Sequence, residues 1–442
     1  MEEIRTSPGG VRVFSVDKFK TARLSLLLAV PANGREMVEN LLLLLCARRG
    51  TEVYENLAAI NRRLDDLYAA TLSCRHFMDG DRQVLGFTAE YIEPDFLPDA
   101  TDTAAGVAEV LAQLLLHPKR EADGTLLRGT VAREKQDLVD SICARRNDTR
   151  TYADTRCREL FFAGEPNDPA LLWSEETVLS VTPEELTVRR EELLRDACIS
   201  FFYTGREAEE AVRRRLTEVF GRLCDRCEIA LPVRTERGIR PVQCAEEALP
   251  VTQSVLSIGY RAPLSCVMGG CDYEAFLLLN EMLGVMGTNR LFLRVREQMG
   301  LCYSIGSAID CKKAALFVSC GIRAQAYEAA RRAIGDEIRA IADGRFTDEE
   351  LAAAKQSVDN SLMQLEDSPG AKEAFIYTRL LDGLPIGVAP FRFSVAAVDR
   401  DAVMRVASAL AEDTVFFLRG TQESEEETED QEETEAYVDD EV

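Results

Sequence analysis

The feature that most constrains the fold of this chain is an internal repeat. Arg133–Ile142 (REKQDLVDSI) is echoed by Ala354–Leu362 (AKQSVDNSL), and the shared Lys-Gln pairs lie 220 residues apart. Phe201–Gly205 (FFYTG) is echoed 215 residues later by Phe416–Gly420 (FFLRG). Solenoid repeats have periods of roughly 20 to 50 residues. A much longer period predicts two similar α/β domains instead, each a sheet covered by helices.

Hydrophobic periodicity places the elements of the first copy. It predicts a buried strand within 12–30, helices at 36–49 and 57–69, a hairpin of 71–77 and 83–91, helices at about 94–116, 125–145 and 152–162, a helix starting at Thr182, and a strand at 198–203. The second copy follows the same order, with a strand at 252–260 and a helix at 274–285. We therefore expect domains at 1–228 and 251–420, joined by a linker at 229–250.

Charge divides the chain unevenly. The formal net charge is −24, and residues 421–442 hold twelve acidic residues and no Lys or Arg, so −12 remains for residues 1–420. Such a tail cannot bury enough apolar surface to fold and is predicted to be disordered. The remaining negative charge argues against nucleic acid as a partner.

Composition indicates a soluble globular protein, with 46% hydrophobic and 29% charged residues. The first residues show no secretory signal, and no apolar run is long enough to span a membrane, so we expect a cytoplasmic protein that does not bind membranes. The 13 cysteines are odd in number and irregularly spaced, which argues against a disulfide framework. The single CxxC, Cys224 to Cys227, is a weak zinc or redox signal.

Residues 287–305 hold the clearest candidate site. They predict a helix, a turn at Gly300 and a strand, which can bring Arg296 and Tyr303 to one rim. Both side chains can donate hydrogen bonds to a peptide backbone. The alternative is that Arg296 pairs with Glu297 or another carboxylate, while Tyr303 is a half-buried strand residue.

This segment resembles the second-half signature of the pitrilysin and insulinase (inverzincin) peptidase family. In that family an Arg and a Tyr with this spacing bind the backbone of the substrate peptide. The resemblance extends to the duplicated α/β domains and their lengths, and to Arg49-Gly50-Thr51. It implies two insulinase-type domains and assigns substrate binding to Arg296 and Tyr303.

Active members of the family carry His-x-x-Glu-His on the first-domain helix, just before the Gly-Thr ending. With the register fixed by Gly50, the two His positions fall on Leu41 and Leu45 and the Glu position on Leu44. The third ligand would fall near Ser141, with Asp140 beside it. Leucine cannot bind zinc, so the resemblance implies a degenerate zinc site, no metal, and no hydrolysis by this chain alone.

The only histidines of the chain, His76 and His117, have no Glu or second His at metal-ligand spacing. We expect both to be structural or solvated. Cofactors are therefore expected to be absent, with zinc present only in a partner subunit.

Three functions remain open. The first is the non-catalytic subunit of a two-chain zinc peptidase, a heterodimer in which this chain contributes the Arg/Tyr pair to a zinc-bearing partner. The second is a homodimeric scaffold that binds a peptide or protein without hydrolysing it. The third is an enzyme with unrecognised chemistry, for instance through Cys224 and Cys227. The chain is also similar to zinc-less bacterial members linked with modification of elongation factor P.

Overall fold

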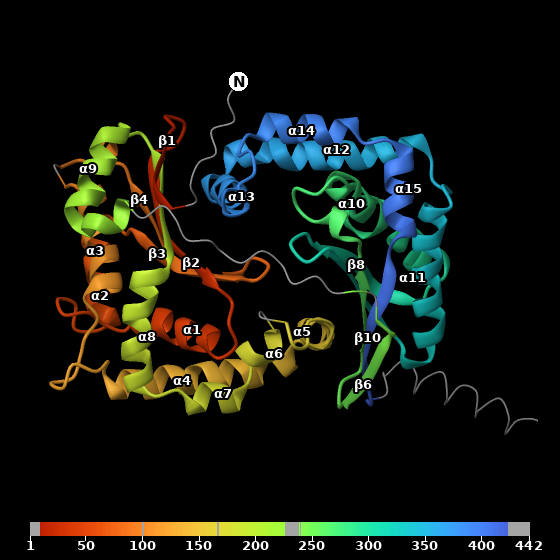
Figure 1. Ribbon diagram of the computed structural model, residues 1–442, viewed down its shortest axis with the longest axis horizontal. Coiled ribbons are helices and arrows are strands. Elements are labelled where there is room, and N and C mark those ends of the chain that lie inside the picture. Colours follow the sequence, from red (N-terminus) through yellow and green to blue (C-terminus); the bar gives the residue numbers. More distant parts are fainter. Residues whose placement is uncertain (1–8, 100, 166–167, 226–237, 239, 423–442) are drawn as a thin grey trace, which may run out of the picture. The chain divides into compact units, whose positions relative to one another are not determined.

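A computed structural model describes residues 9–422, apart from 100, 166–167, 226–237 and 239. The chain forms two compact units, each built on a mixed five-stranded sheet (Figure 1). One unit comprises residues 1–143, 164–235 and 361–391, and the other comprises 144–163, 236–360 and 392–442. The expected fold class, two duplicated α/β domains, is confirmed.

The first unit contains one sheet and most of the helices of the first half. Its strands are β1 (Gly10–Ser15), β2 (Thr21–Pro31), β3 (Thr71–Met78), β4 (Arg82–Ile92) and β5 (Cys198–Gly205). Its helices are α1 (Glu36–Ala47), α2 (Leu57–Asp66), α3 (Thr103–Leu116), α6 (Pro169–Leu172), α7 (Glu175–Ser180), α8 (Pro183–Asp196), α9 (Glu209–Phe220) and α13 (Pro369–Leu381).

The second unit is built in the same way. Its strands are β6 (Gln243–Leu249), β7 (Ser254–Arg261), β8 (Cys302–Asp310), β9 (Ala315–Ile322) and β10 (Ala411–Gly420). Its helices are α5 (Thr149–Phe161), α10 (Tyr273–Asn280), α11 (Tyr327–Ala342) and α15 (Arg400–Ser408). Three helices, α4 (Arg128–Ala144), α12 (Asp348–Gln364) and α14 (Val388–Ala397), contribute residues to both units.

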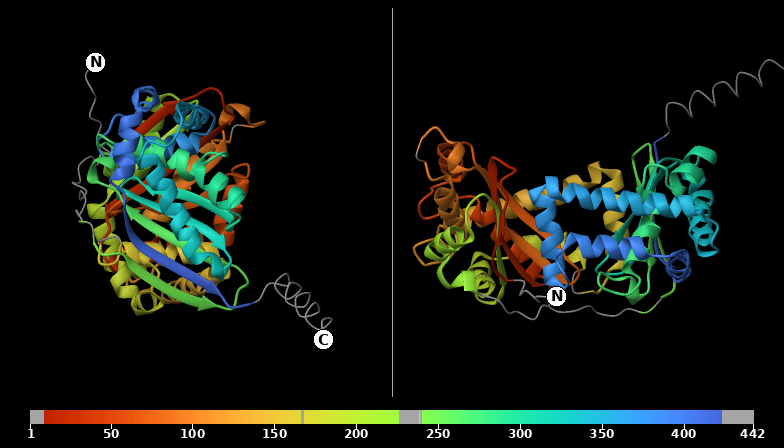
Figure 2. Two further views of the ribbon diagram at one scale, coloured as in Figure 1. Left: turned by 90° about the vertical axis from the view of Figure 1, so that its right-hand side faces the viewer. Right: turned by 90° about the horizontal axis from the view of Figure 1, so that it is seen from above.

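The repeat seen in the sequence reappears in the strand order. The first sheet runs β1-β5-β2-β4-β3 and the second β6-β10-β7-β9-β8. In each sheet only the pair at one edge is parallel, namely β1 with β5 and β6 with β10. The last strand of each unit in the sequence, β5 or β10, lies between the first two strands of that unit. Figure 2 shows β10 (blue) running between the green strands β6 and β7.

The repeat also extends to individual hydrogen bonds. Lys135 on α4 donates to two carbonyls ahead of α8, at 2.6 Å each, and Lys355 on α12 donates to two carbonyls ahead of α15, at 2.9 and 2.6 Å. Gln136 and Gln356 each donate to the side chain four residues later, at 2.7 and 2.8 Å. The repeated lysine therefore anchors the same loop in both copies, and the repeated glutamine makes the same bond within its helix.

One helix from each half of the sequence packs on the sheet of the other half. Helix α5, from the first half, covers the second sheet, where Ala153, Cys157 and Phe161 pack against Phe317 and Phe416. Helices α10, α11 and α15 lie on the opposite face of that sheet (Figures 1 and 2).

Helix α13, from the second half, covers the first sheet in the same way. Its residues Ile376, Tyr377 and Leu380 pack against a group of apolar side chains on β2, β4 and β5. That group comprises Leu27, Ala29, Val84, Cys198 and Phe202. The other face of the first sheet packs against α1, α3, α8 and α9.

An acid–hydroxyl cluster holds each exchanged helix, with a buried carboxylate on α13 and a half-buried one on α5. On α13, Glu373 is 4% exposed and accepts a hydrogen bond from Ser25 at 2.7 Å, while Ser25 lies 2.9 Å from Thr88. On α5, Asp154 accepts from Ser257 at 2.5 Å, and Ser257 lies 3.5 Å from Ser319. A buried carboxylate is tolerated only where hydrogen bonds replace its hydration. These clusters therefore fix the position of each helix along its sheet.

The exchange means that the compact units are not the continuous segments 1–228 and 251–420 expected from the sequence. Apolar periodicity shows that α5 and α13 each have a face to bury, but not which sheet covers it. The expected linker 229–250 also differs, because its residues 243–249 form β6, which pairs with β10. Residues 226–237, 239 and 423–442 lie outside the described structure, and with them most of the predicted disordered tail.

Most local predictions are confirmed. The hairpin is β3 and β4, which pair from Thr71 with Glu90 to Met78 with Gln83. Thr182 caps α8 in a capping box with Glu185, and Thr347 caps α12. Among the described helices, none combines the length and apolar composition that a membrane span requires.

Replacing Phe161 tests how much the exchanged α5 contributes to stability. Its ring is fully buried, with centroids 4.9 Å from those of Phe162 and Phe317. Phe161→Ala should lower the free energy of unfolding by about 3–5 kcal/mol, because it leaves a cavity against the second sheet. Urea unfolding followed by circular dichroism measures the change.

Thr155→Ala, on the same helix, is the matched control and should change stability by less than about 0.5 kcal/mol. Equal unfolding midpoints for Phe161→Ala and the wild type would show that α5 does not depend on this contact.

Candidate functional site

The degenerate zinc positions lie on α1 and belong to the apolar core. Leu41 and Leu44 are each 6% exposed, and Leu45 is half-buried and packs against the same cluster. A leucine side chain offers no lone pair to a metal. The residues present at these positions do not fit zinc.

The ending of α1 is retained for structural reasons. A Cβ added at Gly50 would lie 2.7 Å from the Glu55 carbonyl oxygen, so this position requires glycine. Arg49 pairs with buried Glu134 and with Asp137, at 2.8 Å from the latter, both on α4. The Arg-Gly-Thr signature therefore describes how α1 ends and contacts α4, whether or not a metal is bound.

The predicted position of the third ligand offers no replacement. Ser141 and Asp140 are exposed on α4, and the Asp140 carboxylate accepts a hydrogen bond from Gln136 at 2.7 Å. Within residues 9–422, leaving aside the masked positions, no group of three His, Cys, Asp or Glu side chains could hold a metal ion.

The two histidines have separate environments. His76 on β3 is half-buried, with its Nε2 atom 3.1 Å from the Gln83 side chain, and burial lowers its pKa to about 4. His117 follows α3 with 47% of its side chain exposed, and its Nδ1 atom lies 3.6 Å from a carboxylate oxygen of Glu52. Among the described residues, neither histidine belongs to a group of three His, Cys, Asp or Glu side chains that could hold a metal ion.

The segment that carries Arg296 and Tyr303 departs from regular secondary structure at three points. Phe292–Gln298 form a π-helical stretch, and Gly300 has a φ of +61°. The register of β8 against β9 then shifts, so that Tyr303 is the extra residue of a β-bulge. Both kinds of irregularity recur at functional sites, where they redirect side chains. The expected helix, turn and strand are confirmed.

Arg296 is an exposed guanidinium with weak ties to its neighbours. It lies 4.8 Å above the Phe292 ring, and its Nε atom is 3.7 Å from Glu297, with 44% of the side chain exposed. Burial raises the pKa of the Cys302 thiol to about 11, and the charge of Arg296 opposes that rise, which locates the guanidinium near the start of β8. The pairing with Glu297 that the alternative interpretation expects is therefore present, between two exposed side chains.

Tyr303 is 52% exposed, so it is not the half-buried strand residue of the alternative interpretation. Its phenolic oxygen accepts a hydrogen bond from Nε of Arg323 at 3.2 Å. A phenol that accepts from a cation still has its own proton to donate. Tyr303 is therefore available as a donor at the surface.

Arg150 is a further residue at this rim that the sequence did not indicate. It lies in the first turn of α5, and its Nη1 atom is 3.4 Å from the Ser304 hydroxyl oxygen. It is exposed, as are Arg296 and Arg323. Three guanidinium groups, those of Arg150, Arg296 and Arg323, therefore surround the start of β8. This strand lies at one edge of its sheet. No local signal marks Arg150, because only the exchange of α5 brings it here.

The CxxC candidate is only partly described. Cys224 is buried at the end of a 3-10 turn, and Cys227 lies outside the described residues.

Comparison with known proteins identifies the class. Residues 180–358 match the family described as Peptidase M16 inactive domain. The chain is 24% identical over 424 residues to the probable inactive metalloprotease YmfF of Bacillus subtilis (strain 168), covering 96% of this chain and 99% of that protein.

Solved structures share the fold. A conserved protein from Enterococcus faecalis V583 superposes with a TM-score of 0.84 at 21% identity, covering 96% of this chain and 99% of that one. A peptidase M16 inactive domain from Pseudomonas fluorescens gives 0.74 at 16% identity, covering 95% and 98%. The chain therefore has the fold of these M16 proteins, and over residues 180–358 it resembles the insulinase-type, or M16, peptidase family.

The lowered pKa of His76 predicts an acid-sensitive contribution to stability. The folded protein keeps His76 neutral down to about pH 4, whereas the unfolded chain binds a proton below its ordinary pKa of 6.5. This contribution is therefore complete above pH 6.5 and is lost as the pH falls toward 4.

His76→Gln should remove roughly 2 kcal/mol of the stability difference between pH 7 and pH 4.5. Urea unfolding at both pH values measures it. His117→Gln, at the exposed histidine, is the control and should leave the difference unchanged. If His76→Gln is as acid-sensitive as the wild type, His76 is not held neutral in the folded state.

Proposed function

We propose that this chain is the non-catalytic subunit of a two-chain zinc peptidase, with Arg296 and Tyr303 contributing to the site of a zinc-bearing partner. One observation carries the proposal: both donors are exposed beside an edge strand, while the zinc positions of the same chain are leucines in the core. A chain of this kind can hold a peptide but cannot activate water. Hydrolysis then requires metal from another subunit.

The edge of β8 gives the peptide a binding mode. No strand of the described chain pairs with the outer side of β8, so its backbone groups can accept an added strand. Arg296 and Tyr303 stand at the start of that edge, where they can bind carbonyl oxygens of the same peptide. The proposal extends to a cytoplasmic location and to a link with modification of elongation factor P.

The alternative function is a homodimeric scaffold that binds a peptide or protein without hydrolysing it. The same exposed edge supports it, so the stoichiometry of the native complex separates the two functions. Affinity purification of the tagged chain, with zinc quantified in the product, makes the test. An equimolar companion with His-x-x-Glu-His and about one zinc per pair supports the heterodimer. A zinc-free homodimer contradicts it.

Arg296→Ala should reduce peptide turnover by the reconstituted pair roughly tenfold to a hundredfold, since losing a charged hydrogen-bond donor costs about 1.5–3 kcal/mol. Initial rates with a fluorogenic peptide measure the effect. Arg294→Ala is the matched control, because Arg294 lies on the same turn and donates to Gln298 at 2.8 Å. Equal turnover by the Arg296→Ala and Arg294→Ala complexes would remove Arg296 from the site.

The three guanidinium groups at the start of β8 predict a preference for acidic peptides. Arg150→Gln should weaken binding of a peptide with one Glu near its end about threefold to tenfold, and should leave its Gln counterpart unchanged. Fluorescence anisotropy with labelled peptides at two salt concentrations measures both. An equal loss of affinity for the two peptides would mean that Arg150 does not recognise the charge of the Glu side chain.

A further inference from the structure

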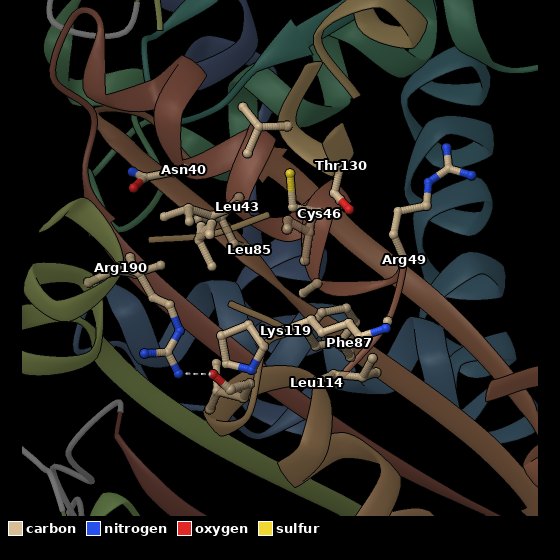
Figure 3. Close-up of a pocket in the computed structure, with 18 of the residues that line it drawn as sticks. Asn40, Leu43, Cys46, Arg49, Leu85, Phe87, Leu114, Lys119, Thr130 and Arg190 are labelled. Atoms are coloured by element: carbon tan, nitrogen blue, oxygen red, sulfur yellow. Dashed lines mark hydrogen bonds between the residues drawn. The ribbon is translucent and has the colours of Figure 1, made fainter. Parts of the chain in front are cut away.

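The first unit contains a cavity behind α1 whose lining is mostly apolar. Its volume is about 100 Å³, and it opens to solvent. Leu43 and Cys46 of α1, Leu85 and Phe87 of β4, and Leu114 of α3 line it (Figure 3). These side chains come from three elements of the main core, so the cavity interrupts an otherwise continuous cluster.

Leaving such a cavity empty and filling it with water are both energetically unfavourable. Protein interiors are packed to crystal density, and voids larger than a water molecule are few. A buried water needs two to four polar partners, and the leucine and phenylalanine side chains that form most of the lining offer none, so polar partners are confined to a few side chains such as Asn40 and Thr130. The environment is apolar enough that burial raises the pKa of the Cys46 thiol to about 12. An apolar group of a ligand would fill this space well.

Polar groups lie around the cavity, and their existing partners differ. Arg49 points its guanidinium away from the other lining side chains (Figure 3) and pairs with Glu134 and Asp137. Arg190 donates to the carbonyls of Leu115 and Leu116, at 2.8 Å each. Both guanidinium groups are therefore already engaged by this chain.

Lys119 is the exception among these cations. Its ammonium group makes one long hydrogen bond, 3.3 Å to the Glu55 carbonyl oxygen, and no described carboxylate lies within ion-pair distance. Lys119 is half-buried at the rim. A cation in this position, beside an apolar chamber, is complementary to an anionic head attached to an apolar tail.

We propose that this cavity binds a single-chain amphipathic carboxylate, a medium-chain fatty acid or close analogue, with the tail against Leu43, Leu85 and Phe87 and the carboxylate on Lys119. Of the degenerate zinc-site positions, Leu44 lines the cavity, whereas Leu41 and Leu45 do not. The cavity lies in the first unit, whereas Arg296 and Tyr303 lie in the second. The proposal therefore stands independently of the peptidase-subunit function.

Calorimetric titration of the full chain with decanoic acid, decanol and decylamine tests the proposal. Decanoic acid should bind at one site per chain, raise the melting temperature, and bind at least roughly tenfold more tightly than the other two. Lys119→Gln should abolish the advantage of decanoic acid over decanol. Lys20→Gln, a lysine outside the lining, is the matched control and should bind decanoic acid as the wild type does.

Cys46→Phe, which fills the cavity, should eliminate binding of both decanoic acid and decanol. Ala47→Leu is the second filling variant, for use if Cys46→Phe fails to fold by circular dichroism. No saturable binding of decanoic acid to the wild type would overturn the proposal. So would equal affinity for decanol, or unchanged binding by a folded filling variant.

Discussion

The arrangement of this chain depends on two carboxylates, of which Glu373 is buried and Asp154 is half-buried. Glu373 and Asp154 lie on helices that each half of the sequence contributes to the sheet of the other half, and each accepts a hydrogen bond from a serine in the middle of that sheet. A desolvated carboxylate without such a partner would be costly, so each helix has essentially one acceptable position. Apolar contacts supply most of the burial on both sheets, and the carboxylates select the register.

The position that Asp154 gives to α5 also determines part of the candidate site. The helix that places Asp154 under Ser257 also carries Arg150, one turn earlier, to the hydroxyl of Ser304 on β8. A residue of the first half therefore takes part in the rim formed by Arg296 and Tyr303 of the second half. The rim requires both copies of the repeat, although the recognisable signature lies in one of them.

The sequence predicted what depends on local pattern. The repeat, the hairpin, the cap at Thr182 and the leucine stripe of α1 were all visible, because side-chain periodicity and capping residues act within a few positions. The helix exchange was not, since periodicity shows that a face is buried but not which sheet buries it. The role of Arg150 was missed for the same reason. The bulge at Tyr303 depends on how β8 pairs with β9, and the residues near Tyr303 in the sequence do not determine that pairing.

The leucines at the degenerate metal positions of α1 take a different part in the fold from metal ligands. In a zinc-bearing relative the i, i+3 and i+4 positions of this helix must be polar and must face the metal. Here Leu41 and Leu44 are almost fully buried in the main core, so their apolar surface contributes to folding instead. Arg49 still joins α1 to α4 through Glu134, which preserves the shape of the site without its ligands. The metal positions on α1 and the exposed edge of β8 are thus physically separate, so the residues at one can change while the other stays exposed.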